Sequence, residues 1–244
     1  MISIKDVNVI VNESEVVKNV SLNIETGKVV ALLGPNGSGK SSLAHALVGN
    51  PDYKITGGVT LDGKNLLSMP IEERAKAGLF LSFQHPQDIP GVSINSFLRS
   101  ALNARLEKPI SLAEFRSTMK IALDTLGLPE SFAERSLNEG FSGGEKKRAE
   151  MLQLLVLKPK YAILDETDSG LDVDALKTVA RTIKELVGPD FGCLVITHHS
   201  KILDILHPDE ILVMGEGKIV KRGGAELAGE IEKKGFKIKL EDVR

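Results

Sequence analysis

One segment constrains the fold of this chain more than any other. The apolar run Val29 to Leu33 is followed at once by Gly34-Pro35-Asn36-Gly37-Ser38-Gly39-Lys40-Ser41. An uninterrupted apolar run suits a strand that helices cover on both faces. A helix is predicted from about Lys40 to the stop signal Gly49-Asn50-Pro51. This order of strand, loop and helix indicates an α/β fold, and it gives the motif G-x-x-x-x-G-K-[ST] the context that the motif requires.

The glycine-rich loop has the chemistry of a phosphate site. Glycines let its backbone turn tightly, and the freed N–H groups, with the positive end of the following helix, attract polyanions. Lys40 adds a full charge for the β- and γ-phosphates, and Ser41 offers a hydroxyl to Mg²⁺. The residues predicted to bind a nucleoside triphosphate are Gly34, Pro35, Asn36, Gly37, Ser38, Gly39, Lys40, Ser41 and Ser42. The alternative is a glycine-rich turn with a coincidental lysine.

Composition narrows the remaining function classes. The chain has 244 residues, of which 42% are hydrophobic, and its net charge of -2 gives no electrostatic reason to expect a nucleic-acid partner. No apolar run approaches the ~20 residues that span a bilayer, and the N-terminus lacks a signal-peptide pattern. The single cysteine, Cys193, lies in an apolar run and is predicted to be a buried core residue. These features predict a cytoplasmic location.

A second apolar run ends in two acids. Tyr161 to Leu164 is a predicted strand, and Asp165 and Glu166 follow it directly. Buried acids are unfavourable without a nearby cation, and the carboxyl ends of strands in an α/β sheet face the ligand crevice. We therefore expect Asp165 to hold Mg²⁺ and Glu166 to accept a proton from an attacking water molecule. Two acids that cap a surface strand are the alternative.

Periodicity predicts the remaining elements. Further strands are expected at 7–11, 20–24, 59–61, 78–83, 193–197, 211–214 and 218–221. The stretch from about Pro86 to Pro159 is predicted to be helical, with capping boxes that begin at Ser111 and Ser142. Residues 225–244 are expected to form a short helix and a tail. The whole reads as an α/β core with a helical insertion.

Three further features narrow the choice of family. Ser142-Gly143-Gly144-Glu145 resembles the signature sequence of ABC ATPases, with Phe141 for the usual Leu and Glu145 for the usual Gln. Gln84 resembles the Q-loop glutamine of that family, and His198 resembles its switch histidine. The order of these motifs matches ABC ATPase domains across nearly the whole chain. The alternatives are a plain N-cap for Ser142, a solvated loop residue for Gln84, and a core histidine for His198, whose neighbour His199 leaves the choice of histidine open.

The resemblance implies a P-loop NTPase of the ABC type, with a RecA-like core, an N-terminal antiparallel β subdomain and an inserted α-helical subdomain. One domain, 1–244, would then consist of a nucleotide-binding core, 1–85 and 159–244, and a helical subdomain, 86–158. The implied activity is ATP hydrolysis with ATP and Mg²⁺ bound between two chains. The sequence alone does not decide whether the signature acts on the ATP of a second chain, since a helix of about 14 residues and the returning strand also permit a cis arrangement.

The resemblance also assigns roles to individual residues. The implied catalytic residues are Lys40, Gln84, Glu166 and His198, and the implied Mg²⁺ ligands are Ser41, Gln84 and Asp165. Further implied nucleotide contacts come from Ser142, Gly143, Gly144 and the D-loop residue Asp172. Capping of the helix that follows is an alternative role for Asp172.

Longer stretches resemble one branch of this family. Residues 82–93, 141–148 and 164–177 look like the SufC family, the ATPases of the SUF iron–sulfur cluster assembly system. That resemblance implies SufB- and SufD-like scaffold proteins as partners. The alternative from the residues is the nucleotide-binding subunit of a membrane transporter, and the "IPGVS" run at 89–93 favours the SufC-like branch. A nucleotide-gated binding module with incidental turnover is a third hypothesis.

Two departures from the ABC pattern affect the expected site. Many ABC domains stack adenine on an aromatic residue in the first strands, but residues 8–15 contain none, and Val11 offers only a flat apolar contact. Glu145 places an acid near the triphosphate region. As the last residue of a capping box it would turn back to its own helix end, and Lys146, Lys147 and Arg148 would either offset its charge or form a solvated face.

Overall fold

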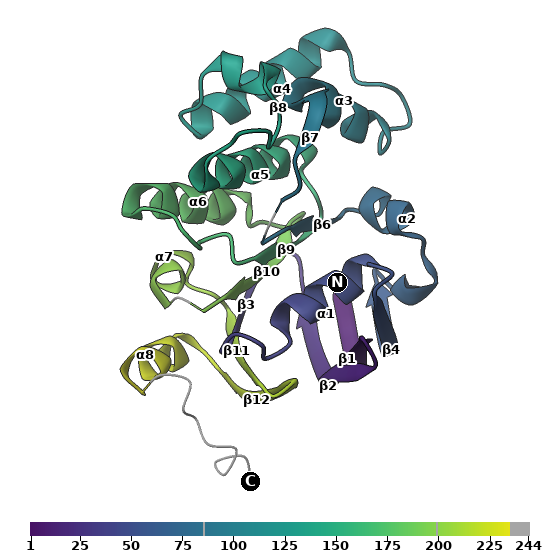
Figure 1. Cartoon of the computed structure of the whole chain (residues 1–244), viewed down its shortest axis with the longest axis vertical. Coiled ribbons are helices and arrows are strands. Elements are labelled where there is room, and N and C mark those ends of the chain that lie inside the picture. The colour runs from purple at the N-terminus through teal and green to yellow at the C-terminus, as the bar shows by residue number, and fades with distance from the viewer. Residues whose placement is uncertain (85, 199, 235–244) are drawn as a thin grey trace.

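The computed structural model describes residues 1–84, 86–198 and 200–234. Figure 1 shows a central sheet with helices on its faces, helices α3 to α5 at one end of the long axis, and α8 with β12 at the other. The strands of the described residues form three sheets. None of the helices in these ranges is long and apolar enough to cross a membrane.

The core sheet has six strands in the order β12-β11-β3-β10-β9-β6. Its strands are β3 (Val29–Leu33), β6 (Leu79–Ser82), β9 (Tyr161–Asp165), β10 (Gly192–Thr197), β11 (Glu210–Gly215) and β12 (Lys218–Gly223). All neighbours are parallel except β12, which forms an antiparallel hairpin with β11. Because the carboxyl ends of parallel strands lie on one edge, the loops after β3, β6, β9 and β10 meet there.

Both faces of the core sheet are buried, as the apolar runs predict. Along β3, Val29, Ala31 and Leu33 pack into one hydrophobic core, and Val30 and Leu32 pack into another. The first core contains residues from the helices that follow Gln84, and the second contains residues from α1 (Lys40–Val48) and the N-terminal sheet. Alternate side chains of a strand point to opposite faces, so one apolar run serves two cores.

The N-terminal sheet is antiparallel, with the order β2-β1-β4-β5. Its strands are β1 (Ile2–Val11), β2 (Ser14–Ile24), β4 (Tyr53–Leu61) and β5 (Lys64–Asn65). The sequence predicted β4 only from Val59 onward, because Gly57 and Gly58 interrupt the apolar pattern. A Cβ at Gly57 would lie 2.5 Å from the carbonyl oxygen of Asp6, so glycine permits the close approach of β1 there.

The remaining elements are mostly helical. They are η1 (Leu66–Ser68), α2 (Ile71–Lys76), β7 (Ile89–Ser93), α3 (Ile94–Asn103), α4 (Leu112–Thr125), η2 (Glu130–Glu134), β8 (Ser136–Leu137), α5 (Gly143–Leu157), α6 (Val173–Leu186), η3 (Ser200–Ile202), α7 (Leu203–Leu206) and α8 (Ala225–Lys234). Both capping boxes predicted from the sequence are present, at Ser111 before α4 and at Ser142 before α5.

One prediction for this region is wrong. The stretch after Pro86 was expected to be helical throughout, but Ile89–Ser93 is β7, which pairs antiparallel with β8. Pro90 and Gly91 explain the difference, because proline and glycine both disfavour a helix interior. The fold class is confirmed, with its antiparallel N-terminal sheet and mixed core sheet. The boundaries at 85/86 and 158/159 stay a prediction, and the expected tail at 235–244 lies outside the described residues.

Candidate functional site

Most of the predicted site residues, though not the signature segment, meet at the carboxyl edge of the core sheet. Leu33 at the end of β3 pairs with Thr197 of β10, and Asp165 at the end of β9 pairs with Ile196. On the far side of β9, Ser82 of β6 pairs with Leu164. The residues that follow these strand ends are Gly34, His198, Glu166 and, after Phe83, Gln84. Sheet register therefore gathers four of the five sequence motifs on one edge.

The loop from Gly34 to Ser41 connects β3 to α1 in a backbone path that needs glycine. A Cβ at Gly34 would lie 2.3 Å from the carbonyl oxygen of Met214, and one at Gly39 would lie 2.5 Å from that of Val16. Gly39 is the N-cap of α1, has a φ of 105° and makes no side-chain capping bond. The first amides of α1 are thus left for an external acceptor, as an anion site at a helix N-terminus requires.

Lys40 folds back over this loop. Its Nζ donates hydrogen bonds of 2.9 Å to the carbonyl oxygens of Gly34 and Pro35, and one of 3.4 Å to Oγ of Ser38. Burial lowers the pKa of the Lys40 ammonium, while the carboxylates of Glu166 and Asp165 oppose that shift. The loop therefore holds a positive charge at its centre, and the donor set fits a polyphosphate. Ser41 and Ser42 follow on the first turn of α1 and are partly exposed.

Asp165 carries a buried carboxylate oxygen that lacks a partner. The residue is 1% exposed, and no hydrogen bond to its Oδ1 occurs within the described part of the chain. Burial raises the pKa of Asp165, while the nearby Ser41 side chain opposes that shift. An orphaned buried oxygen beside a serine hydroxyl fits an oxygen-coordinated cation such as Mg²⁺. No cluster of three or more His, Cys, Asp or Glu suited to a metal occurs in residues 1–84, 86–198 and 200–234, so the phosphates would have to share such a cation.

Glu166 is held by two other predicted residues. The side-chain amide of Gln84 donates a hydrogen bond to Oε2 of Glu166, and Nδ1 of His198 lies 3.2 Å from Oε1. Glu166 is 6% exposed and has a φ of 49°, in the left-handed region that a glutamate rarely adopts. Its backbone N–H donates to the carbonyl oxygen of Ile196 at 2.9 Å, which fixes the turn out of β9. Backbone strain of this kind is typical of functional sites.

The signature segment lies at the N-terminus of α5. Oγ of Ser142 accepts a bond from the Glu145 N–H at 3.3 Å, and Oε2 of Glu145 accepts one from the Ser142 N–H at 2.9 Å. A Cβ at Gly143 or Gly144 would meet nothing within 4 Å, so there is open space beside both α-carbons. Ser142 and Gly144 line a hollow of about 540 Å³, whose other wall includes Asp172 and Thr178. The P-loop residues are not among those that line it.

The charge of Glu145 is offset by a residue that the sequence did not indicate. Arg135 pairs with Oε1 of Glu145, and its guanidinium lies 4.0 Å from the ring centre of Phe141. Hydrogen bonds from Ser142 and Arg135 lower the pKa of Glu145 from 4.5 to about 2. The expectation that Lys146, Lys147 and Arg148 would offset this charge or form a solvated face is therefore wrong for Lys147, which is buried and paired with Glu150 instead.

Asp172 caps α6, as the alternative reading of that residue proposes. Its Oδ1 accepts a hydrogen bond of 2.8 Å from the N–H of Ala175. The side chain is exposed and lines the same hollow as Ser142. A capping role and a role at a chain interface are therefore compatible. His199, the neighbour that left the choice of histidine open, lies outside the described residues.

Two contacts near the site escaped sequence reasoning. Tyr53 of β4 pairs across the strands with Val11, and its ring stacks on that of His45 at 5.4 Å. Glu150 of α5 is 3% exposed and accepts a hydrogen bond from the backbone of Phe83 at 2.7 Å. The sequence did offer a signal for Glu150, because an acid that adjoins the apolar stretch of a predicted helix indicates a buried charge with a specific partner. Nothing local signals Tyr53, because its position depends on the pairing of β1 with β4.

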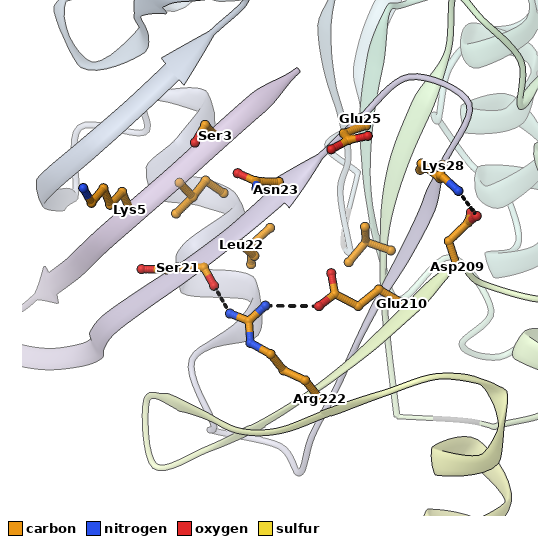
Figure 2. A pocket seen from close by; sticks show the side chains of 12 residues that line it. Ser3, Lys5, Ser21, Leu22, Asn23, Glu25, Lys28, Asp209, Glu210 and Arg222 are labelled. Carbon is orange, nitrogen blue, oxygen red and sulfur yellow. Dashed lines mark hydrogen bonds and ion pairs between the residues drawn. The ribbon is translucent and has the colours of Figure 1, made fainter.

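Another hollow lies on the opposite edge of the core sheet (Figure 2). It measures about 580 Å³ and is bordered by Lys28 and Glu210, which lie at the amino ends of β3 and β11. Four of the charged side chains that line it form pairs: Lys28 bonds Asp209 at 2.7 Å, and Arg222 bonds Glu210 at 3.1 Å. The hollow lies between the N-terminal sheet and the core sheet. It is remote from the carboxyl edge that carries the phosphate loop.

A phosphate-binding loop at the end of a buried parallel strand, with an acid pair ending a strand two places away, defines a P-loop nucleotide-binding protein. The family model described as ABC transporter matches residues 17–169. The chain belongs to this family. The matched range includes the P-loop, Gln84, the signature segment and both acids, while Asp172 and His198 follow it.

Close relatives align over almost their entire length. Vegetative protein 296 of Bacillus subtilis (strain 168) is 50% identical over 238 residues, which cover 96% of this chain and 91% of the relative. A probable ABC transporter ATP-binding protein of Streptococcus pyogenes serotype M1 is 48% identical, and the alignment covers 97% of this chain and 93% of that relative. The probable ATP-dependent transporter slr0075 of Synechocystis sp. (strain ATCC 27184 / PCC 6803 / Kazusa) is 48% identical, with 100% and 97% covered.

Solved structures share the fold. The dimeric structure of MJ0796, a bacterial ABC transporter cassette, superposes with a TM-score of 0.81 at 24% identity, covering 92% of this chain and 99% of that one. The structure of an ATP-binding subunit of an ABC transporter gives a TM-score of 0.80 at 22% identity, covering 98% and 95%.

Proposed function

We propose that this chain is an ATPase that binds Mg-ATP, pairs with a second ABC chain, and couples hydrolysis to conformational change in SufB- and SufD-like scaffold proteins during iron–sulfur cluster assembly. The observation that carries the ATPase activity is the fixed Glu166 carboxylate. Its two oxygens contact Gln84 and His198 at the edge of the sheet where the phosphate loop lies.

The P-loop binds the triphosphate of ATP. Lys40 exchanges its loop carbonyl partners for β- and γ-phosphate oxygens, and the amides at the start of α1 supply further donors. Ser41, Asp165 and the amide oxygen of Gln84 would hold Mg²⁺, and a bound Mg²⁺ would neutralise charge that develops on the phosphates. The Gln84 amide nitrogen is committed to Glu166, which leaves its oxygen as the acceptor group.

Glu166 accepts the proton of the attacking water molecule. A general base must lie within hydrogen-bond reach of that water, and Gln84 and His198 restrict the carboxylate to one orientation. The His198 ring contacts the carboxylate on the Oε1 side. The residue thus combines a buried setting with a fixed position, and the fixed position raises the efficiency of proton transfer.

The second half of the site comes from another chain. The exposed Ser142 and Gly143 and the half-buried Gly144 form a helix N-terminus where an external anion could bind. The hollow beside Ser142 and Gly144 is bordered by the Asp172 loop and not by the P-loop of the same chain. Both observations are explained if the signature segment contacts the γ-phosphate of ATP that is bound to the P-loop of a partner chain. Asp172 then lies at the contact between the two chains.

The surface of β7 supports a protein partner beyond the ABC pair. Ile89 is 38% exposed, Val92 is 36% exposed, and Phe83 nearby in the chain is 45% exposed. Apolar side chains in one surface strand and the loop before it suit a docking site. The three SufC-like stretches, one of which contains β7, favour scaffold proteins as the occupant.

The second candidate is the nucleotide-binding subunit of a membrane transporter. The names of the Streptococcus and Synechocystis relatives favour it. In that case the surface around β7 would contact a permease, and the chemistry at Glu166 would be unchanged.

Affinity purification from native cytosol separates the two candidates. The tagged chain is isolated without detergent, alongside a variant with Ile89→Asp and Val92→Asp. A matched control carries Ile121→Asp, since Ile121 of α4 is 65% exposed but lies outside β7. We expect SufB- or SufD-like proteins with the wild type and the control, and their loss with the β7 variant. Recovery of a polytopic membrane protein, seen only with detergent, would overturn the scaffold assignment.

A further inference from the structure

A buried ion pair lies on the helix that begins at the signature. Lys147 and Glu150 stand one turn apart on α5, with Nζ 3.2 Å from Oε2 and side chains 6% and 4% exposed. Removing two charges from water is unfavourable, and buried pairs are often no better for stability than apolar residues of similar size. This pair therefore calls for a role other than stability.

Both charged groups also bond the backbone of one residue. Oε1 of Glu150 accepts a hydrogen bond from the N–H of Phe83 at 2.7 Å, and Nζ of Lys147 donates one of 3.1 Å to the Phe83 carbonyl oxygen. Phe83 is 45% exposed, and its ring centre lies 5.9 Å from that of His45. Burial of its own side chain therefore does little to fix the position of Phe83. The ion pair therefore hydrogen-bonds the peptide groups on both sides of the Phe83 α-carbon.

Phe83 is the residue before Gln84, which contacts the proposed catalytic carboxylate of Glu166. Phe83 follows β6 and precedes Gln84, whose side-chain amide donates to Glu166. We propose that Lys147 and Glu150 are positioning residues, which hold Phe83 so that Gln84 orients the Glu166 carboxylate. The inference rests on the ATPase activity proposed above.

The position of the pair gives it a second consequence. Ser142, which caps α5, and Lys147 lie within the first turns of the same helix. A displacement of α5 at its signature end therefore reaches Phe83 and Gln84 through short polar contacts. In the paired assembly, the signature of one chain meets the ATP of the other, so this contact links the γ-phosphate of one site to the carboxylate of the second site.

The test replaces the ion pair with apolar residues. In Lys147→Met with Glu150→Leu, the core stays filled and a role in stability alone predicts normal turnover. The positioning role predicts that kcat falls about 10- to 100-fold, while the Kd for Mg-ATP stays within about threefold. Lys147→Met with Glu150→Gln keeps an acceptor for the Phe83 N–H and should recover most of the kcat that the apolar double variant loses. Lys146→Met is the matched control, because Lys146 pairs with Asp88 further along the same loop at 2.7 Å and should stay close to wild type.

A double-mutant cycle and a spectrum complete the test. In a Gln84→Ala background the apolar replacement should lower kcat little further, because both changes act through one residue. With selective nitrogen-15 labelling of glutamine, the Gln84 side-chain amide signal should shift in the apolar variant as it does in Glu166→Gln. Normal kcat in the apolar variant, or an unmoved Gln84 signal, would refute the positioning role. Absence of ATP turnover in the wild type, with the Gln84 signal shifting as expected, would instead contradict the ATPase activity.

Discussion

The side-chain amide of Gln84 donates a hydrogen bond to Oε2 of Glu166, although the two residues are 82 positions apart in the chain. The contact joins the loop after β6 to the end of β9, and these strands are neighbours in the core sheet. With His198 on its other oxygen, Glu166 cannot turn away from the edge that carries the phosphate loop without breaking one of the two contacts.

Replacement of Glu166 tests the proposed base. We expect Glu166→Gln to lower ATP turnover about 10²- to 10⁴-fold, because glutamine cannot accept the proton of water. ATP affinity should stay within a few fold of wild type, since no phosphate contact is lost. Phosphate release and equilibrium binding measure the two quantities, with the exposed Glu139→Gln as control. Full turnover in Glu166→Gln would remove this residue from the mechanism.

The same variant tests the two-chain site. With hydrolysis blocked, Mg-ATP should accumulate between two signature-bearing chains. We expect Glu166→Gln to elute as a dimer, or as a closed complex with its partner, on size exclusion with saturating Mg-ATP. Addition of Ser142→Arg should prevent this shift, because a bulky cation would obstruct the helix N-terminus. An unchanged elution volume at saturating ATP would argue against the sandwich.

The ion pair between Glu145 and Arg135 predicts a pH-dependent contribution to stability. The pKa of Glu145 is lowered from 4.5 to about 2 in the folded chain. The stabilisation is therefore complete above pH 4.5 and is lost as pH falls toward 2, where the carboxylate gains a proton. We expect the difference in unfolding free energy between wild type and Glu145→Gln to shrink over this range in urea titrations. The exposed Glu107→Gln should show no such trend, and a constant difference for Glu145→Gln would contradict the pairing.

We predict that the wild-type chain discriminates only weakly between ATP and GTP. Val11 lies at the end of β1 and pairs with Tyr53, whose ring already stacks on His45. An aromatic side chain at position 11 would add a stacking surface worth about 0.5–1.5 kcal/mol. We expect Val11→Tyr to tighten ATP binding about 2- to 10-fold and to increase the preference for ATP over GTP. Titration of both nucleotides into wild type, Val11→Tyr and Val11→Leu measures this. Strong discrimination against GTP by the wild type would show that the base is read elsewhere.

Cys193 should be chemically inert in the folded chain. Its side chain is fully buried in β10, and burial raises the pKa of the thiol to about 12. The thiolate is the reactive form, so Ellman's reagent should not modify the native protein over hours but should react fully in concentrated guanidinium. Ser117→Cys, on the exposed side of α4, serves as a reactive control. Rapid modification of the native wild type would contradict the burial of Cys193.

The sequence by itself determined the motifs whose geometry is local. The P-loop, the capping box at Ser142 and the N-cap at Asp172 each depend on a few consecutive residues, and their structures follow from them. The apolar runs of β3, β9 and β10 determined a sheet buried on both faces. The order of the motifs was sufficient to indicate the ABC family.

Only the tertiary structure decided which distant residues share a contact. Gln84, Glu166 and His198 meet because β6, β9 and β10 are neighbours in register, and no local pattern encodes that order. Arg135 reaches Glu145 through the turn after η2, whereas the sequence offered only the adjacent Lys146, Lys147 and Arg148 as possible partners. Lys147 and Glu150 are buried because the loop after β6 folds onto α5, where Phe83 offers the backbone groups that satisfy both charges. A buried charge needs a partner wherever the fold can supply one, and here the partner comes from 67 and 64 positions away in the chain.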